Sequence, residues 1–245
     1  MDIKFIELED VANGFIKPVP AVKHMPGWFK KTPAIKFMRD LGHKDMTIKK
    51  CVPVLDVFST GYYFINTHDI YYDFNEDKGE SYFSFDKKVL GTNKPITMHP
   101  FEQIDKMNME GEYHEYAYKW SNPYVIETPP GYSCLFTQPP NQVLPFLTLS
   151  GVVDTDSHPL AVQFPFIMRK GFTGVIKANT PLVHIIPFER EEWNMQIIGK
   201  PSNLQQQNHS AAAESFNRSR VDSNNGINLV GGEYKKKHRK VKKYR

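Results

Sequence analysis

The chain has 245 residues, of which 40% are hydrophobic and 13% aromatic, and its formal net charge is +4. This apolar content is enough for a folded core, so the composition excludes a globally disordered chain. The apolar stretches are far shorter than the roughly 20 residues of a membrane-spanning helix, and residues 1–10 lack the pattern of a secretory signal. We therefore expect a soluble, cytoplasmic protein that does not contact a membrane.

The N-terminal quarter predicts short elements. Apolar residues at positions 3, 5 and 6 favour a strand. Prolines at positions 18, 20, 26 and 33 exclude a long helix, although one helical turn fits residues 26–31 because proline is tolerated at the first helical position. Pro53 begins a predicted helix that Gly61 ends, and residues 62–65 then predict a strand.

The central region predicts antiparallel strands. Residues 69–74 and 81–86 are rich in aromatic residues and flank a charged turn, so they predict a hairpin. Residues 112–120 alternate with a period of two, and residues 124–128 form the next predicted strand. Pro129-Pro130-Gly131 fits a type II turn, because glycine accepts positive φ at the third position of the turn.

Short strands continue from residue 132 to residue 189, separated by Pro, Gly and Asn. Short strands that are regularly separated by these turn-forming residues are typical of a β-sandwich or β-barrel. We predict a single mainly β domain over residues 1–198. Its fold class is an antiparallel sandwich or jelly-roll-like barrel with one or two short helices in the N-terminal quarter.

The C-terminal region differs from the rest in composition. Residues 199–234 are rich in Asn, Ser and Gln, and they predict a flexible polar linker. The last eleven residues, KKKHRKVKKYR, hold eight of the 31 basic residues and no acidic residue. The rest of the chain has 23 basic and 27 acidic residues, so its net charge is −4. We predict that this basic tail contacts nucleic acid non-specifically, through Lys235, Lys236, Lys237, Arg239, Lys240, Lys242, Lys243 and Arg245. The alternatives are a solvated tail or one that docks on an acidic partner.

Five segments occur in order between about residues 20 and 195: KHMPGWFKK, KKCVPVLDVFSTGYYF, NPYVIETPPGYSCLFTQPPN, SGVVDTD followed by FPF, and NTPLVHIIPFEREEW. Together they resemble an uncharacterised family of proteins from tailed phages, including marine T4-like phages, and from some bacteria. The resemblance implies a compact, largely β domain located in the host cytoplasm or in the virion. It implies no activity.

Residues 150–190 also resemble the dUTPase and dCTP deaminase β-barrel pattern. On that resemblance, Asp154 matches a carboxylate that orients water near the sugar. The sequence departs from the pattern at Ser157, where an aromatic residue is expected, and at Ala178-Asn179, where glycine is expected. No phosphate-binding loop precedes these residues, although a nucleotide hydrolase needs donors and a metal for the phosphates.

Three residues are candidates for catalysis: Asp154, Asp156 and His184. The two aspartates follow Gly151-Val-Val and predict a turn in which carboxylates accept backbone N–H groups, with a divalent-ion or water-orienting pair as the alternative. His184 lies in an apolar strand, where histidine is usually a hydrogen-bonded core residue.

A two-histidine, one-carboxylate metal site would need His114, Glu115 and His184. Adjacent residues on a strand point to opposite faces, so His114 and Glu115 share a face only if the backbone bulges. We therefore expect no metal and no cofactor. The two cysteines, Cys51 and Cys134, cannot form a disulfide framework, and we expect both to be buried as small apolar residues.

The function remains open between two classes. The favoured hypothesis is a non-enzymatic, phage-associated binding or structural protein, because no complete catalytic motif is present. In it, the β domain contacts a protein partner or a second copy of the chain, since its tyrosine clusters suit protein contact and neighbouring acids repel phosphate. The alternative is a small-molecule or nucleotide enzyme on a dUTPase-like or cupin-like barrel that uses Asp154 or His184.

Overall fold

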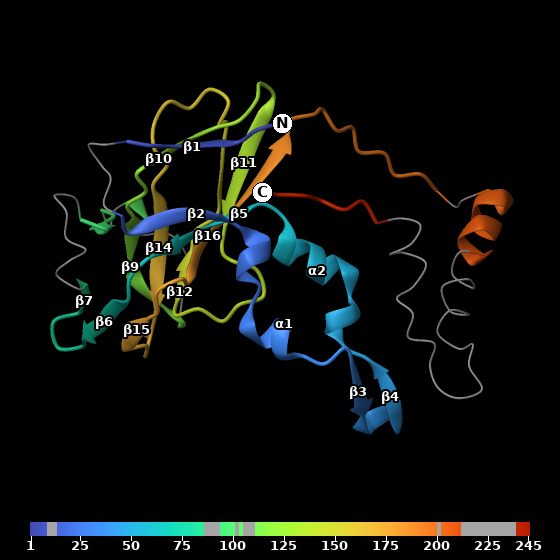
Figure 1. Cartoon of the computed structure of the whole chain (residues 1–245), viewed down its shortest axis with the longest axis horizontal. Coiled ribbons are helices and arrows are strands. Elements are labelled where there is room, and N and C mark those ends of the chain that lie inside the picture. The colour runs from blue at the N-terminus through green and yellow to red at the C-terminus, as the bar shows by residue number, and fades with distance from the viewer. Residues whose placement is uncertain (9–13, 86–93, 101–102, 105–110, 200–201, 212–238) are drawn as a thin grey trace. The chain divides into compact units, whose positions relative to one another are not determined.

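The computed structural model describes residues 1–8, 14–85, 94–100, 103–104, 111–199, 202–211 and 239–245. Most of the regular structure is antiparallel β-sheet, which confirms the predicted mainly β, sandwich-like fold (Figure 1). No helix among the described residues is long and apolar enough to cross a membrane. The chain forms two compact units: Met1–His24 with Thr60–Arg190 and Tyr244–Arg245, and Met25–Ser59 with Glu191–Lys243. The boundaries of the predicted domain, linker and tail stay predictions.

The first unit is built around a five-stranded sheet. Pro18 and Pro20 lie in its edge strand, where the missing N–H groups of proline are tolerated. Gly61 precedes the neighbouring strand with φ +72°, the left-handed conformation that glycine favours. The strand order is β13 (Gly151–Val153), β11 (Tyr132–Thr137), β16 (Pro181–Glu189), β5 (Tyr62–Asn66) and β2 (Ile16–Pro20), and a 3-10 helix follows β2 at Ala21–His24.

A four-stranded sheet packs against the five-stranded sheet through aromatic side chains. The Phe164 ring lies 5.1 Å from Phe136 and 5.5 Å from Phe64, between centroids. The buried Thr148 hydroxyl donates to the Leu182 carbonyl at 2.7 Å, so a hydrogen bond also joins the sheets. The strand order is β12 (Phe146–Thr148), β14 (Phe164–Arg169), β9 (Tyr113–Trp120) and β8 (Ile96–Met98).

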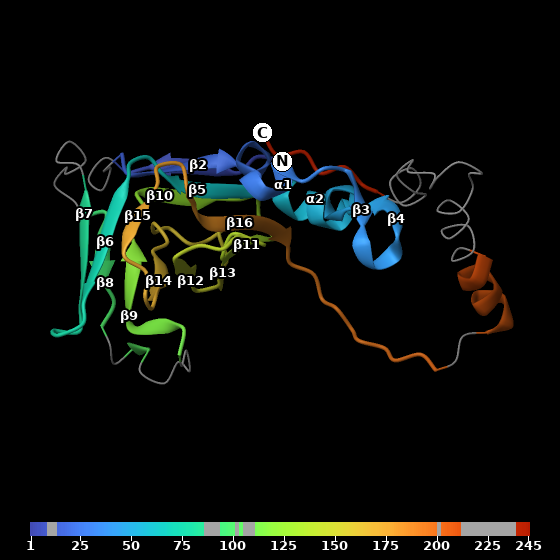
Figure 2. The ribbon, with the colours of Figure 1, turned by 90° about the horizontal axis from the view of Figure 1, so that it is seen from below.

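Two smaller sheets complete the first unit. The predicted hairpin is confirmed as β6 (Ile70–Asn75) and β7 (Glu80–Phe85), which lie side by side in Figure 2. β15 (Gly174–Ile176) pairs with the other edge of β6. β1 (Lys4–Glu7) pairs with β10 (Tyr124–Glu127). The turn predicted at residues 129–131 is also present, since Gly131 has φ +86° and the Tyr132 N–H donates to the Pro129 carbonyl at 3.2 Å.

The Met25–Ser59 segment of the second unit contains two α-helices and a hairpin. Phe29 and Phe58 are both buried, with ring centroids 4.9 Å apart, and the Lys49 ammonium lies 4.6 Å from the Phe29 ring. These contacts join the helix predicted near residue 53 to the turn predicted at residues 26–31. The elements are α1 (Gly27–Lys31), β3 (Ile35–Met38), β4 (His43–Met46), α2 (Val52–Ser59) and the 3-10 helices Arg39–Leu41 and Ile48–Lys50.

A helix at residues 203–211 lies inside the segment predicted as a flexible linker. Its first turn has reciprocal capping. The Gln205 backbone N–H donates to the Ser202 hydroxyl at 3.4 Å, and the Ser202 N–H donates to the Gln205 side-chain oxygen at 3.1 Å. This is a capping box, so the Ser-x-x-Gln spacing could have predicted where the helix begins.

Candidate functional site

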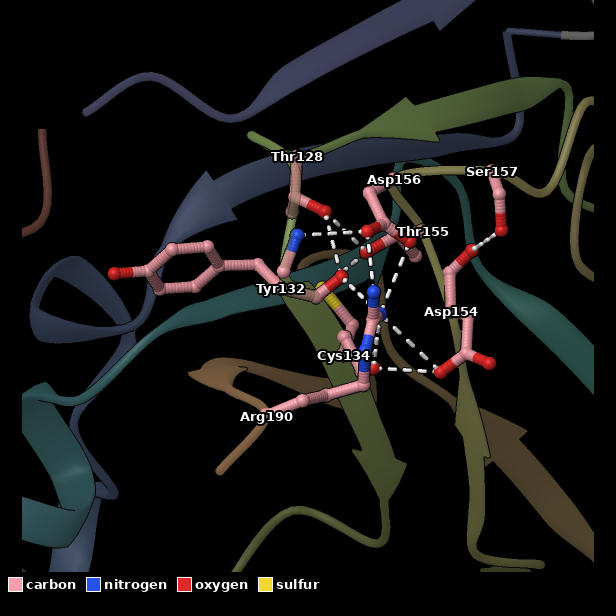
Figure 3. Close-up of polar contacts among 10 residues, drawn as sticks. Thr128, Tyr132, Cys134, Asp154, Thr155, Asp156, Ser157 and Arg190 are labelled. Atoms are coloured by element: carbon pink, nitrogen blue, oxygen red, sulfur yellow. Dashed lines mark hydrogen bonds and ion pairs between the residues drawn. The ribbon is translucent and has the colours of Figure 1, made fainter. Parts of the chain in front are cut away.

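The ends of three strands bring the candidate aspartates together with residues that the sequence did not single out. Cys134 on β11 lies opposite Val153 on β13, and Tyr132 lies opposite Glu189 on β16. The residues just beyond β13 and β16 therefore meet at the start of β11 (Figure 3). We call Ser133, Asp154, Asp156 and Arg190 the strand-end cluster.

Arg190 is the centre of the strand-end cluster. Its guanidinium donates to the Ser133 hydroxyl at 2.9 Å and to the Tyr132 carbonyl at 3.0 Å. It also donates to both carboxylate oxygens of Asp156, with one distance of 3.0 Å, and lies 3.4 Å from Asp154 Oδ1 (Figure 3). Its backbone N–H donates to the Gly131 carbonyl at 2.8 Å. One side chain thus links the ends of all three strands.

The Asp156 carboxylate is held in its ionised form. Its side chain is only 9% exposed, and besides Arg190 it accepts the Gly131 N–H at 2.8 Å. The hydrogen bonds from Arg190 and then Gly131 lower the pKa of Asp156 to about 2. A carboxylate with this pKa stays ionised near neutral pH and does not act as a proton donor there.

Asp154 and Asp156 accept hydrogen bonds from different donors across the sheet. Asp154 Oδ1 accepts the Ser133 hydroxyl at 2.7 Å, and the Asp154 backbone carbonyl accepts the N–H groups of Ser157 and His158 at 3.1 and 3.0 Å. The predicted turn is therefore present. The predicted capture of a backbone N–H by a carboxylate occurs at Asp156, but its donor lies across the sheet and not in the same turn.

The strand-end cluster lacks the parts of a nucleophilic site. Ser133 is completely buried, and its hydroxyl is shared between an acid and a guanidinium, without a histidine base. The neighbouring Cys134 is also completely buried, and burial raises the pKa of its thiol while the Thr155 hydroxyl opposes that shift. Cys134 is thus the buried apolar residue that was predicted, whereas Cys51 is only half-buried.

His184 lies away from the aspartates. It pairs with Thr137 on β11, four residues from Ser133, which places it roughly 13 Å along the strand from the cluster. Its Nε2–H donates to the Thr60 carbonyl at 2.6 Å, and burial lowers its pKa, with the Thr60 bond opposing that shift. His184 is the hydrogen-bonded core histidine that its apolar strand predicted. Among the described residues, no group of three or more His, Cys, Asp or Glu could hold a metal ion.

The basic terminus is partly docked on an acid of its own unit. The Arg239 guanidinium donates to Asp56 Oδ1 at 2.7 and 3.1 Å, and the Lys242 ammonium lies 3.4 Å from Asp56 Oδ2. Asp56 is a buried residue of α2. Its burial raises its pKa, but Arg239 and Lys242 outweigh that effect and leave the pKa below the usual value. In the sequence, Asp56 is the one acid in a short apolar helix, VPVLDVFS. An acid that is buried in this way needs a cation partner, so the sequence could have indicated that Asp56 has one.

The other described cations of the terminus pair with no acid in the described part of the chain. Lys240, Lys243 and Arg245 are exposed, and no hydrogen bond or ion pair within the described residues engages them. Tyr244 lies edge-on against Tyr62 with ring centroids 5.6 Å apart, so the terminus has a second contact. Lys235, Lys236 and Lys237 lie outside the described residues.

Comparisons with known proteins returned no match: no family model, no curated protein and no solved structure is similar to this chain. The resemblances to the phage family and to the dUTPase pattern therefore stay predictions.

Proposed function

We propose that this chain is a non-enzymatic binding protein whose basic terminus contacts nucleic acid or another polyanion and whose β unit contacts a protein partner. The observation that carries the proposal is the division of cations at the terminus. Arg239 and Lys242 are neutralised by Asp56, whereas Lys240, Lys243 and Arg245 stay exposed and unpaired among the described residues. Exposed cations release counterions when they bind phosphates.

Exposed tyrosines support the protein-contact part of the proposal. Tyr71 is 49% exposed and Tyr82 is 46% exposed. Tyr71 pairs with Ser84 and Tyr82 pairs with Asp73, so both rings stand on the outer face of the β6–β7 hairpin. Exposed aromatic residues are frequent anchors of protein interfaces, and the flanking Asp73 disfavours phosphate at this face.

The test is the salt dependence of binding to a duplex DNA of random sequence. Full-length protein is compared with a variant that lacks residues 235–245, over a series of salt concentrations. Deletion of eight cations should flatten the plot of log affinity against log salt, because each cation on a phosphate contributes about −0.9 to the slope. An unchanged slope would show that the basic terminus does not contact DNA, which would contradict this part of the proposal. Mass spectrometry of purified virions separately tests the phage association: presence in the virion supports a structural role, and absence favours a role in the infected cell.

The enzymatic alternative has less support. A barrel enzyme that uses His184 would need this residue to reach a substrate, but His184 is 1% exposed. The Asp154 side chain is 64% exposed, but its carboxylate is hydrogen-bonded to Ser133 and Arg190. Incubation with a panel of nucleoside triphosphates and magnesium tests it. Turnover that Asp154→Asn abolishes would replace the binding proposal.

A further inference from the structure

A hollow of about 570 Å³ lies in the first unit, away from the strand-end cluster. Three segments surround it: the turn of the β6–β7 hairpin, the start of β9, and the loop between β14 and β15. Its size is that of ordinary small-molecule sites. Its lining includes Phe74, Glu76, His114, Glu115, Tyr116 and Lys170.

A bulge in β9 forms one wall of the hollow. Ala117 lies opposite Ile167, but the next pair is Tyr113 with Arg169, so β9 has three residues where β14 has one. Adjacent residues of a regular strand point to opposite faces. Because the backbone bulges here, His114, Glu115 and Tyr116 all border the same hollow. Bulges that re-aim side chains are frequent next to functional sites.

His114 is a buried polar residue of β9. It is 8% exposed, and its Nε2 is buried and makes no hydrogen bond with any residue that the structure describes. Its ring packs on Phe74 with centroids 3.9 Å apart. Burial and then Lys170 lower the pKa of His114, and Glu76 opposes them, so the imidazole is neutral at pH 7. An unsatisfied buried nitrogen costs stability, which is why most buried polar groups in folded proteins have a partner.

The lining combines hydrogen-bond donors, acceptors and aromatic faces. Glu76 and Glu115 only accept, Lys170 only donates, and a neutral His114 does both. The two carboxylates repel an anionic ligand. At His114 the charge of Lys170 outweighs that of Glu76, so a cation that pairs with the imidazole is repelled as well. A hydroxyl group can satisfy every one of these residues, because it donates and accepts. The rings of Phe74, Tyr116 and Phe172 supply apolar faces for the C–H side of a sugar ring. We propose that the hollow binds a neutral saccharide.

The test is ligand-observed NMR on the full chain with glucose, galactose and N-acetylglucosamine. Glucuronate and glucosamine are the charged comparators, and adenosine is the comparator with a ribose and a base. At least one neutral sugar should bind with a Kd on the order of 1 mM, the range that a ligand of this size reaches at ordinary efficiency. Each charged comparator should bind about threefold or more weakly. No binding by any of the three neutral sugars, or tighter binding by a comparator, would overturn the proposal.

Two substitutions test whether the sugar binds in the hollow. Tyr116→Ala removes a stacking face and should weaken binding about fivefold or more, and His114→Phe keeps the packing on Phe74 but removes the ring nitrogens and should weaken it similarly. Phe188→Ala is the matched control, because Phe188 is an exposed aromatic residue of β16 that does not line the hollow. Its affinity should equal that of the wild type. If both test variants bind the sugar normally while retaining the wild-type amide spectrum, the site is not here and the proposal fails.

Discussion

Asp56 is predicted to restrain the basic terminus, and Asp56→Asn is the substitution that reveals it. The carboxylate holds Arg239 and Lys242, so a polyanion must compete with it for these two cations. Asparagine keeps the shape of the side chain but removes the charge that attracts them. The variant should therefore bind polyanions more tightly than the wild type does.

The magnitude follows from the number of cations released. Two additional cations on phosphates steepen the slope of log affinity against log salt by at most about 1.8, at about 0.9 for each. Fluorescence anisotropy with a labelled duplex DNA, repeated between low and physiological salt, measures both slopes. Asp40→Asn is the matched control, because Asp40 is exposed in the 3-10 helix Arg39–Leu41 and pairs with no cation among the described residues. Asp40→Asn changes the net charge by the same amount as Asp56→Asn.

The comparison separates a local release from a general charge effect. Asp56→Asn should steepen the slope, and Asp40→Asn should leave it within error of the wild type. Equal slopes for the three proteins would show that Asp56 does not keep Arg239 and Lys242 from the polyanion. Equal steepening by both variants would show that net charge alone governs binding. Either result would refute the restraint by Asp56.

Two further predictions concern the first unit. Arg190→Met should remove an acid-sensitive part of the stability. The folded-state pKa of Asp156 is about 2, below its usual value of 3.8, so its contribution is present above about pH 4 and is lost as the pH falls toward 2. Urea unfolding at pH 2, 3, 4 and 7 should show a smaller loss across this range in the variant, and an equal loss in both proteins would exclude the Arg190–Asp156 pair as its source. Gly61→Ala should lower the free energy of unfolding by about 3 kcal/mol or more, because a Cβ would lie 2.0 Å from the Ile185 carbonyl oxygen in addition to the cost of positive φ. Gly14→Ala, with φ +61° and open space around the Cβ, should cost only about 1–2 kcal/mol, and equal losses would show that the close approach to β16 is unimportant.

The fold was largely predictable because its signals are local. Alternating and aromatic-rich runs predicted β6, β7, β9 and the later strands, and Pro129-Pro130-Gly131 predicted its turn. β2 was missed because its two prolines argue against a strand, and only its place at the sheet edge makes them acceptable. β4 was missed because its sequence, HKDM, is polar, and β3 and β8 were missed because four and three residues are too few to show a period. Pairing with a neighbouring strand decides the conformation of all three.

The sites were less predictable because they depend on contacts between distant residues. Asp154 and Asp156 could be singled out, but Arg190 lies 34 residues beyond Asp156, and only the register of three strands brings them together. For His114 and Glu115, the sequence predicts opposite faces for a regular strand, and the bulge that changes this comes from the pairing of β9 with β14. The docking of Arg239 on Asp56 spans 183 residues, which no local pattern can specify.

The most direct measurement of the central claim is lysine-reactivity footprinting with and without a duplex DNA. Each lysine is acetylated by a brief pulse of reagent, and mass spectrometry reports its protection. Lys240 and Lys243 should lose reactivity when DNA is present, whereas Lys170 of the β unit should not change. Protection of Lys170 without protection of Lys240 and Lys243 would contradict the assignment of polyanion binding to the terminus.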